Sequence, residues 1–196
     1  AYLEWTVWRA FLAAGGLVRP PYEARRFPID QDFLPVGTAP GNGPDLVMEF
    51  EDFVLAAEVT LSESSRQEAM EGEPVRRHVA DLVTRYGKES GKPVYGLFLA
   101  NRIDSNTAET FRIGVWYTRE DQRMQLHIVP LTIPQFSAFF RAMFQANRAA
   151  PMEILRLLER CGRWREGCEA PRWKEKIGLT VAQAIGEMEG EPQTPA

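Results

Sequence analysis

The chain contains little cysteine and histidine and has no long hydrophobic run. Cysteine and histidine each occur twice in 196 residues, and Cys161 and Cys168 have no histidine near them. That pattern fits neither a zinc module nor a disulfide framework, so we expect reduced thiols. No segment approaches the ~18 consecutive apolar residues of a membrane span, and no basic segment precedes an apolar core at the start. We therefore expect no membrane partner, no signal peptide and a cytoplasmic location.

An excess of positive charge is also missing. The chain has 23 basic and 27 acidic residues, a net charge of -4. Non-specific DNA affinity comes mainly from neutralising phosphates, so strong DNA binding by the chain alone is not expected. No helix-turn-helix or zinc module that reads bases is apparent. The sequence also lacks an initiator methionine and begins at once with a helical pattern, which suggests a trimmed chain or a piece of a longer one.

The length and the 44% hydrophobic content predict one well-formed core. We expect a single domain over residues 1–185, whose part from about residue 134 is helical. Residues 186–196 lack core-forming residues, and we expect that tail to be disordered.

Periodicity predicts an alternation of helices and strands along the chain. A helix over residues 2–14 ends at Gly15-Gly16, and a long irregular segment rich in proline and glycine follows over residues 19–44. The later predictions are a helix over 64–86 divided at Pro74, strands over 93–100, 112–117 and 124–129, and helices over 135–147 and 152–161. A strand joined to a later strand through a helix implies an α/β fold with a mixed central β-sheet flanked by helices.

Between these elements, residues 46–61 read as a β-hairpin around the two-residue turn Glu51-Asp52. If Phe50 pairs with Phe53, Asp45 lies opposite Glu58. Directly opposed like charges are destabilising unless a positive charge lies between them. Mg²⁺ takes oxygen ligands and would supply that charge.

Paired carboxylates that hold Mg²⁺ suit the hydrolysis of a phosphodiester, which needs an activated water and a stabilised leaving oxygen. In this hypothesis Asp45 and Glu58 bind the metal and the backbone carbonyl of Val59 is a third ligand. Thr60 lies on the same face as Glu58 and points toward the attacking water. Glu4 shares a helical stripe with apolar residues, and two interpretations stay open: an active-site role, or a first-turn acid favoured by the helix dipole.

The order of these features resembles a known family. Pro44-Asp45, then Glu58-Val59-Thr60, is similar to the PD-(D/E)XK nuclease motif. Matches in the same order over residues 2–140 resemble AlwI-type type IIS restriction endonucleases, in particular their cleavage domains and small subunits: Glu4-Trp5, Trp8-Arg9, Arg66-Gln67, Glu71-Gly72, Val75, Arg77-His78, Leu97-Phe98-Leu99, Ile103-Asp104, Val129-Pro130-Leu131-Thr132 and Gln135-Phe136.

The resemblance implies a restriction-endonuclease-like core and a Mg²⁺-dependent endonuclease of a restriction-modification system that cuts one strand of duplex DNA. It also implies a heterodimer, in which a larger subunit or another domain recognises the sequence. It implies no organic cofactor. Two alternatives remain: a structure-specific nuclease of the junction-resolvase kind, and a catalytically inactive nuclease fold that serves as an interaction module.

The chain departs from the motif at Thr60, where a catalytic lysine is usual. The resemblance implies that the next helix supplies a substitute, with Arg66 or Gln67 orienting water or contacting the phosphate. Glu71 and His78 share a stripe with Gln67 and would support the site, although a lone helical histidine is also a common packing residue.

Arg76 and Arg77 are candidates for contacts with DNA phosphates. The competing interpretation is a solvated helix face on which the arginines pair with neighbouring acids.

Overall fold

The computed structural model describes residues 1–62 and 67–190, and its centre is a four-stranded mixed sheet. The strands are β1 (Leu46–Glu49), β2 (Val54–Thr60), β3 (Val94–Ala100) and β6 (His127–Thr132), in the spatial order β1-β2-β3-β6. β1 and β2 are antiparallel, whereas β2, β3 and β6 are parallel to one another. The predicted mixed α/β fold is therefore confirmed.

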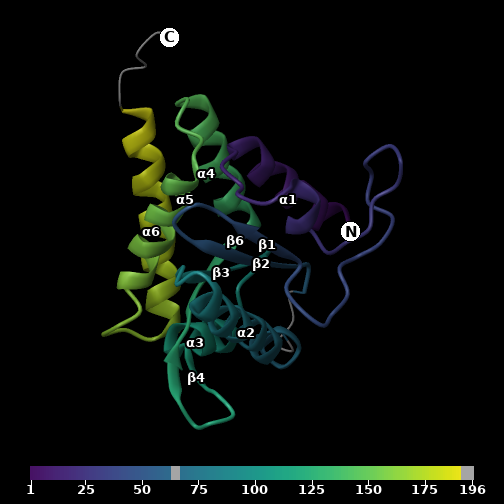
Figure 1. Ribbon diagram of the computed structural model, residues 1–196. Coiled ribbons are helices and arrows are strands. Elements are labelled where there is room, and N and C mark those ends of the chain that lie inside the picture. The colour runs from purple at the N-terminus through teal and green to yellow at the C-terminus, as the bar shows by residue number, and fades with distance from the viewer. Residues whose placement is uncertain (63–66, 191–196) are drawn as a thin grey trace.

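Helices cover both faces of the sheet (Figure 1). On one face lie α1 (Tyr2–Ala14), α4 (Ile133–Gln145) and α5 (Pro151–Arg163), and on the other lie α2 (Glu73–Glu89) and α3 (Ser105–Ile113). α6 (Ala170–Glu189) packs outside this layer against α4, α3 and α5. The connections β2–α2–β3 and β3–α3–β6 are parallel crossovers, so the carboxyl ends of β2, β3 and β6 share one edge of the sheet.

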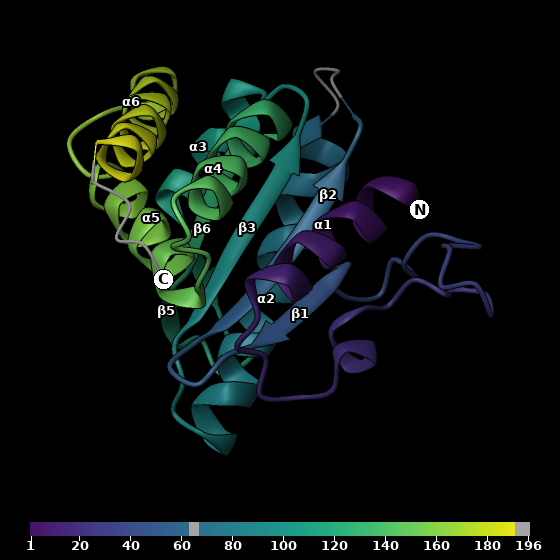
Figure 2. The same ribbon diagram turned by 90° about the horizontal axis from the view of Figure 1, so that it is seen from above.

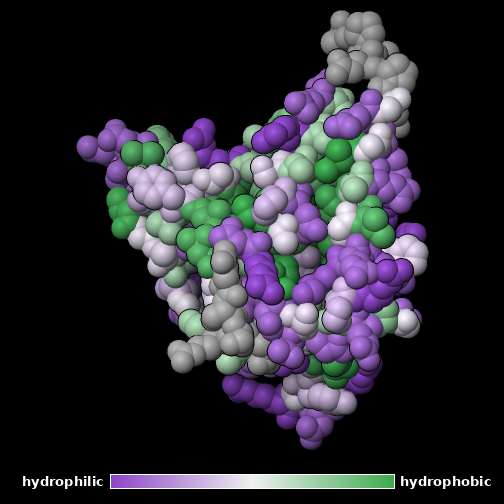
Figure 3. All heavy atoms as spheres, turned by 180° about the vertical axis from the view of Figure 1, so that it is seen from behind, coloured by the Kyte–Doolittle hydropathy of each residue, from purple (hydrophilic) through white to green (hydrophobic). Residues whose placement is uncertain are grey.

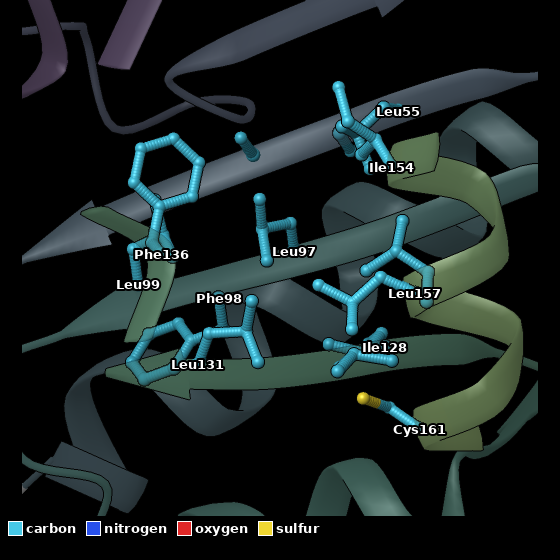
Figure 4. Close-up of a cluster of buried hydrophobic side chains, with 14 of the residues drawn as sticks. Leu55, Leu97, Phe98, Leu99, Ile128, Leu131, Phe136, Ile154, Leu157 and Cys161 are labelled. Carbon is cyan, nitrogen blue, oxygen red and sulfur yellow. The ribbon is translucent and has the colours of Figure 1, made fainter. Parts of the chain in front are cut away.

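Successive side chains of the central strands point to opposite faces of the sheet, and apolar side chains on both sides bury both faces. Leu97 and Leu99 of β3 point toward α4 and α5, where Phe136, Ile154 and Leu157 contact them in a fully apolar cluster (Figure 4). Phe98 points to the opposite face, and its ring lies 5.2 Å from that of Phe111 in α3. Strands buried on both faces are apolar throughout, as this one is.

The hairpin register agrees with the sequence prediction. Leu46 pairs with Ala57 and Glu49 with Val54, while the amide of Phe50 donates to the carbonyl of Phe53 at 2.9 Å. The turn is therefore Glu51-Asp52, and continuation of the register places Asp45 opposite Glu58.

Glu49, at the other end of β1, forms the centre of a polar cluster. Its carboxylate accepts bonds from Arg19 at 2.6 Å, from Lys92 at 2.9 Å and from the Tyr86 hydroxyl at 3.2 Å. Nearly the whole side chain is buried, so the ion pairs offset the cost of removing its charge from water. The cluster fixes the segment after α1 and the end of α2 against the hairpin.

Several predicted elements are confirmed with small shifts. The first helix ends at Ala14, where Gly15 and Gly16 both have positive φ. The segment 19–44 is irregular except for a short 3-10 helix, η1 (Pro21–Ala24), and lies beyond the β1 edge of the sheet (Figure 2). Pro74 marks a boundary as expected: a π-helical segment, η2 (Glu68–Gly72), precedes it and α2 follows.

Other predictions were wrong. Residues 112–113 belong to α3, and only Val115–Tyr117 forms the strand β4, which pairs with β5 (Arg123–Gln125) in a separate two-stranded sheet. The alternation of apolar residues suggested a longer strand, but Asp104 caps α3 by accepting from the amides of Asn106 and Thr107, and Gly114 ends the helix. Residues 186–189 are helical because α6 continues to Glu189 and buries Met188, whereas residues 191–196 lie outside the described residues.

The described residues include no helix that is long and apolar enough to cross a membrane. Viewed from behind, the surface carries hydrophobic patches separated by hydrophilic ones (Figure 3). Several exposed large apolar side chains belong to the irregular segment between α1 and β1: Val18, Tyr22, Phe33, Leu34 and Val36.

Candidate active site

Asp45 and Glu58 lie together where the β1–β2 hairpin opens. Asp45 Oδ2 accepts a 2.8 Å hydrogen bond from the amide of Val59. At this end of the hairpin a side-chain hydrogen bond thus replaces the backbone pairing between β1 and β2. Glu58 is the last buried residue of β2, with 9% of its surface exposed. The structure thus brings together the two carboxylates that the hairpin register predicted.

Burial and repulsion by neighbouring acids act on both carboxyl groups. Burial, followed by the charge of Glu58, raises the pKa of Asp45 to about 7, and Glu4 and Glu71 contribute further repulsion. Burial also raises the pKa of Glu58, although the contact with His78 offsets part of this rise. A site that holds several acids close together without a compensating cation is a candidate functional site.

His78 of α2 contacts Glu58 directly. Its Nδ1 lies 2.6 Å from Glu58 Oε1, and with an ionised carboxylate this nitrogen is the donor. Its Nε2 is buried and has no hydrogen-bond partner among the described residues. The imidazole is therefore held in place through one nitrogen, which orients Glu58, while the other nitrogen is uncommitted.

Gln67 is placed close to the site, but its amide is occupied. The side chain is fully buried, and Nε2 donates to the carbonyls of Ser62 at 2.7 Å and Arg102 at 2.9 Å. Oε1 accepts from the amide of Asp104 at 2.9 Å. Both N–H groups are thus committed to the backbone, so in this arrangement Gln67 joins the segment after β2 to the loop after β3 and has no free donor for water or phosphate.

Three further candidates surround the carboxylate pair. Glu4 is buried, and its Oε2 accepts from the amide of Ala39 at 3.1 Å. It is therefore not a solvent-exposed acid of the first helical turn. Glu71 lies on the π-helical segment η2, a kind of distortion that is frequent at functional sites. The Thr60 hydroxyl oxygen accepts from the amide of Ser62 at 3.1 Å, which leaves its own proton available for donation.

Arg76 and Arg77, which were predicted to contact DNA phosphates, have hydrogen-bond partners at the start of their own helix. Arg77 pairs with Glu73 at 3.1 Å, and Arg76 donates to the carbonyl of Gly72 at 3.2 Å. These contacts agree with the competing interpretation of a helix face with internal partners. Arg66 lies outside the described residues.

A cavity of about 260 Å³ opens at the carboxylate pair. It is lined by Gly41, Gly43, Asp45, Glu58, Val59, Met70, Glu71, Pro74, Val75 and His78. Within the described residues, no group of three or more His, Cys, Asp or Glu side chains is arranged to hold a metal ion. A cation here would therefore depend on two carboxylates with backbone, water or substrate oxygens, which is the mode that Mg²⁺ commonly uses.

Comparison with known protein families matches residues 1–139 to the model described as AlwI restriction endonuclease. The chain belongs to the AlwI restriction endonuclease family. A search of curated proteins gives no matching relative. Among solved structures, the chain is similar to the small subunit (R.BspD6I2) of the heterodimeric restriction endonuclease R.BspD6I, with a TM-score of 0.73 and 23% sequence identity. That match covers 93% of this chain and 89% of the other and shows a shared fold.

For this member of the AlwI family, the family match contains every candidate residue of the site and ends within α4. The similarity in structure covers 93% of the chain and therefore extends beyond the residues of the family match. Sequence reasoning did not single out Arg26 or Asn42, which line the larger cavity that adjoins the carboxylate site. Asn42 belongs to the Pro-Gly-Asn-Gly-Pro segment before Asp45, a composition that predicts a turn or loop but no particular side-chain contact, and Arg26 has no comparable signal.

Proposed function

We propose that this AlwI-family chain is the catalytic subunit or domain of a type IIS restriction endonuclease with a PD-(D/E)XK site, and that it hydrolyses one strand of duplex DNA with Mg²⁺. The observation that carries the proposal is the opposed pair Asp45 and Glu58 in a cavity at the carboxyl end of β2. Ligand sites in open α/β sheets lie outside the carboxyl ends of the strands.

The residues present fit a hard divalent cation. The raised pKa of Asp45 indicates a site where an added positive charge is favourable. Val59 donates its amide to Asp45, and in an extended strand the N–H and C=O of one residue point to the same side. The Val59 carbonyl therefore faces the space beside Asp45, where it would be the third ligand. A bound Mg²⁺ supplies charge stabilisation and lowers the pKa of its water.

The other residues act on these ligands or on the substrate. His78 orients Glu58, and Thr60 has a hydroxyl proton that it can donate to the attacking water or to a phosphate oxygen. Glu4 and Glu71 add negative potential that favours a cation. Gln67 holds the segment after β2 against the loop after β3.

A partner for sequence recognition follows from the charge and from the comparison. The net charge of -4 gives the chain little intrinsic affinity for duplex DNA. The structurally similar chain is the small subunit of a heterodimeric restriction endonuclease. We propose a larger subunit or a separate domain that delivers this chain to its site, in the cytoplasm.

Nicking of a supercoiled plasmid by the protein together with its recognition subunit tests the proposal. We expect cleavage with Mg²⁺, none with EDTA, and a loss of about 10³-fold or more in Asp45→Ala and Glu58→Ala, because either change removes a metal ligand. Asp52→Ala is a matched control, since this exposed acid lies in the turn of the same hairpin and should leave cleavage unchanged.

Unchanged cleavage in both variants would contradict the assignment of the metal ligands. If the wild-type complex binds DNA but does not cleave it with Mg²⁺ or Mn²⁺, the chain is an inactive nuclease fold that serves as an interaction module. Cleavage that follows DNA junctions in place of a fixed sequence would favour the structure-specific alternative.

A further inference from the structure

Arg26 lies directly beside the proposed metal ligand Asp45. The amide of Arg26 donates to the carbonyl of Asp45 at 3.2 Å, and Arg25 forms an isolated antiparallel bridge with Leu46. The Arg26 segment is therefore a short continuation of the sheet beyond β1, at the point where the active-site hairpin opens.

The Arg26 side chain lines a second cavity, of about 460 Å³, that adjoins the first. Gly43 and His78 line both cavities, so the two are contiguous at these residues. The smaller cavity contains Asp45 and Glu58, and the larger one runs from there between α2 and the irregular segment. A strand of DNA with its scissile phosphate at the carboxylates would place a neighbouring phosphate near Arg26.

The guanidinium of Arg26 has no acidic partner among the described residues. Its Nη2 donates to Asn42 Oδ1, and its Nη1 is buried with no hydrogen-bond partner. The larger cavity also carries Asp81, which is exposed on its α2 wall. The other arginines of this cavity are paired with acids: Arg19 with Glu23 and Glu49, and Arg85 with Glu89.

Gly43 provides the space for this guanidinium. A Cβ built at position 43 would lie 2.2 Å from Arg26 Nη1, so any other residue would displace the side chain. The charge is thus seated against the loop backbone, with a neutral partner on one nitrogen and an unsatisfied donor on the other. Nη1 itself is enclosed by the loop, so a ligand in the larger cavity would approach the part of the Arg26 side chain that lines it.

We propose that Arg26 binds a phosphate of the DNA strand next to the scissile phosphate and so holds the strand across the metal site. The proposal depends on the proposed function, since it takes DNA as the substrate. Phosphate oxygens are strong acceptors that match the planar guanidinium fork. A cation at this position also offsets the repulsion between the DNA and the surrounding acids, Glu4, Asp45, Glu58 and Glu71.

Binding of a fluorescein-labelled duplex to cleavage-deficient Asp45→Asn protein together with its recognition subunit, followed by anisotropy in Ca²⁺ over a range of NaCl concentrations, tests the proposal. In this background we expect Arg26→Gln to weaken binding about tenfold at low salt and to reduce the slope of log affinity against log salt by about one. Arg26→Lys keeps the charge, so it should retain the slope while binding more weakly than arginine.

Arg85→Gln is the matched control, because Arg85 lines the same cavity but is paired with Glu89. It should change neither the affinity nor the slope. Equal affinity and slope in Arg26→Gln and its parent would overturn the proposal, as would the absence of binding by the parent at low salt. If Arg26→Gln does not fold, a reduced slope in Arg26→Lys would overturn it. The assay needs no hydrolysis, so its failure is separate from failure of the nuclease function.

Discussion

Asp45→Asn is expected to abolish nicking, by about 10³-fold or more, and at the same time to stabilise the metal-free protein. The first effect follows from the loss of a charged metal ligand. The second follows from the pKa of Asp45, which burial and the neighbouring acids raise to about 7. Above that pH the folded protein must hold a poorly solvated charge that asparagine lacks. The amide oxygen of asparagine can still accept the hydrogen bond from Val59.

The sign of the pH dependence follows from the same shift. An aspartate whose pKa is higher in the folded state than in the unfolded chain binds more protons when folded, so stability falls as the pH rises from about 4 to about 7. The shift to about 7 sets an upper limit of about 4 kcal/mol on the stability that the protein loses when Asp45 ionises. Because Asp45 is only partly buried, we expect asparagine to increase the free energy of unfolding by about 1–2 kcal/mol at pH 8.

Urea unfolding of the metal-free wild type and variant at pH 5 and pH 8 measures this effect. The difference should be larger at pH 8, and Mg²⁺ should stabilise the wild type more than the variant, because a ligand that binds only the folded state raises its stability. Asp52→Asn, in the exposed turn of the hairpin, should show neither change. A variant that is less stable than wild type at pH 8 without metal would contradict the electrostatic account of the site.

Gln67→Ala is expected to lower the free energy of unfolding by about 3–5 kcal/mol. Three hydrogen bonds join the buried amide to the backbone of Ser62, Arg102 and Asp104, and alanine would leave those groups unsatisfied while opening a cavity. Activity per folded molecule should fall much less than in Asp45→Asn, since the amide positions the loop without contacting the reacting atoms.

Urea unfolding together with nicking under conditions where the variant is folded separates the two roles. Gln122→Ala, an exposed glutamine in the β4–β5 turn, is the control and should change stability by less than about 0.5 kcal/mol. A Gln67→Ala protein of unchanged stability whose activity falls about as far as that of Asp45→Asn would show that Gln67 acts in the chemistry.

The hairpin and its carboxylate pair could be predicted because their geometry is local. A two-residue turn fixes the pairing of every residue on the two strands, so the position of Asp45 opposite Glu58 followed from the turn alone. The mixed sheet followed from the order of strands and helices. The single-domain boundary at residue 185 stays a prediction.

α3 was not predicted, and α6 was expected only as part of a helical region from about residue 134, because the composition of both helices conceals them. α3 has few apolar residues, and the alternation of apolar residues in β4 already begins in its last turn. Only the capping residue Asp104 and the glycine at position 114 indicated a helix. α6 begins in a stretch of lysine, arginine and tryptophan, a composition that is more typical of a solvent-exposed segment than of a buried helix. In the structure Trp173 is fully buried and donates to the carbonyl of Cys161 at 3.0 Å.

The neighbours of the carboxylates depend on contacts between segments that are distant in the sequence. Helical spacing placed His78 and Gln67 on one stripe. It could not show that His78 reaches Glu58, or that both N–H groups of the Gln67 amide are bonded to backbone carbonyls of two loops. Arg26 could not be recognised at all, because its place beside Asp45 is set by an irregular segment without periodicity.

The most direct test of the central claim is the anomalous diffraction of crystals of this protein soaked in Mn²⁺. We expect an anomalous peak bound by Asp45 and Glu58, with the Val59 carbonyl as a third oxygen ligand, at the short distances of about 2.1–2.2 Å that octahedral hard cations adopt. The peak should be absent from Asp45→Asn crystals and present in Asp52→Asn crystals. Ordered Mn²⁺ elsewhere in the wild type, with no peak between Asp45 and Glu58, would contradict the account.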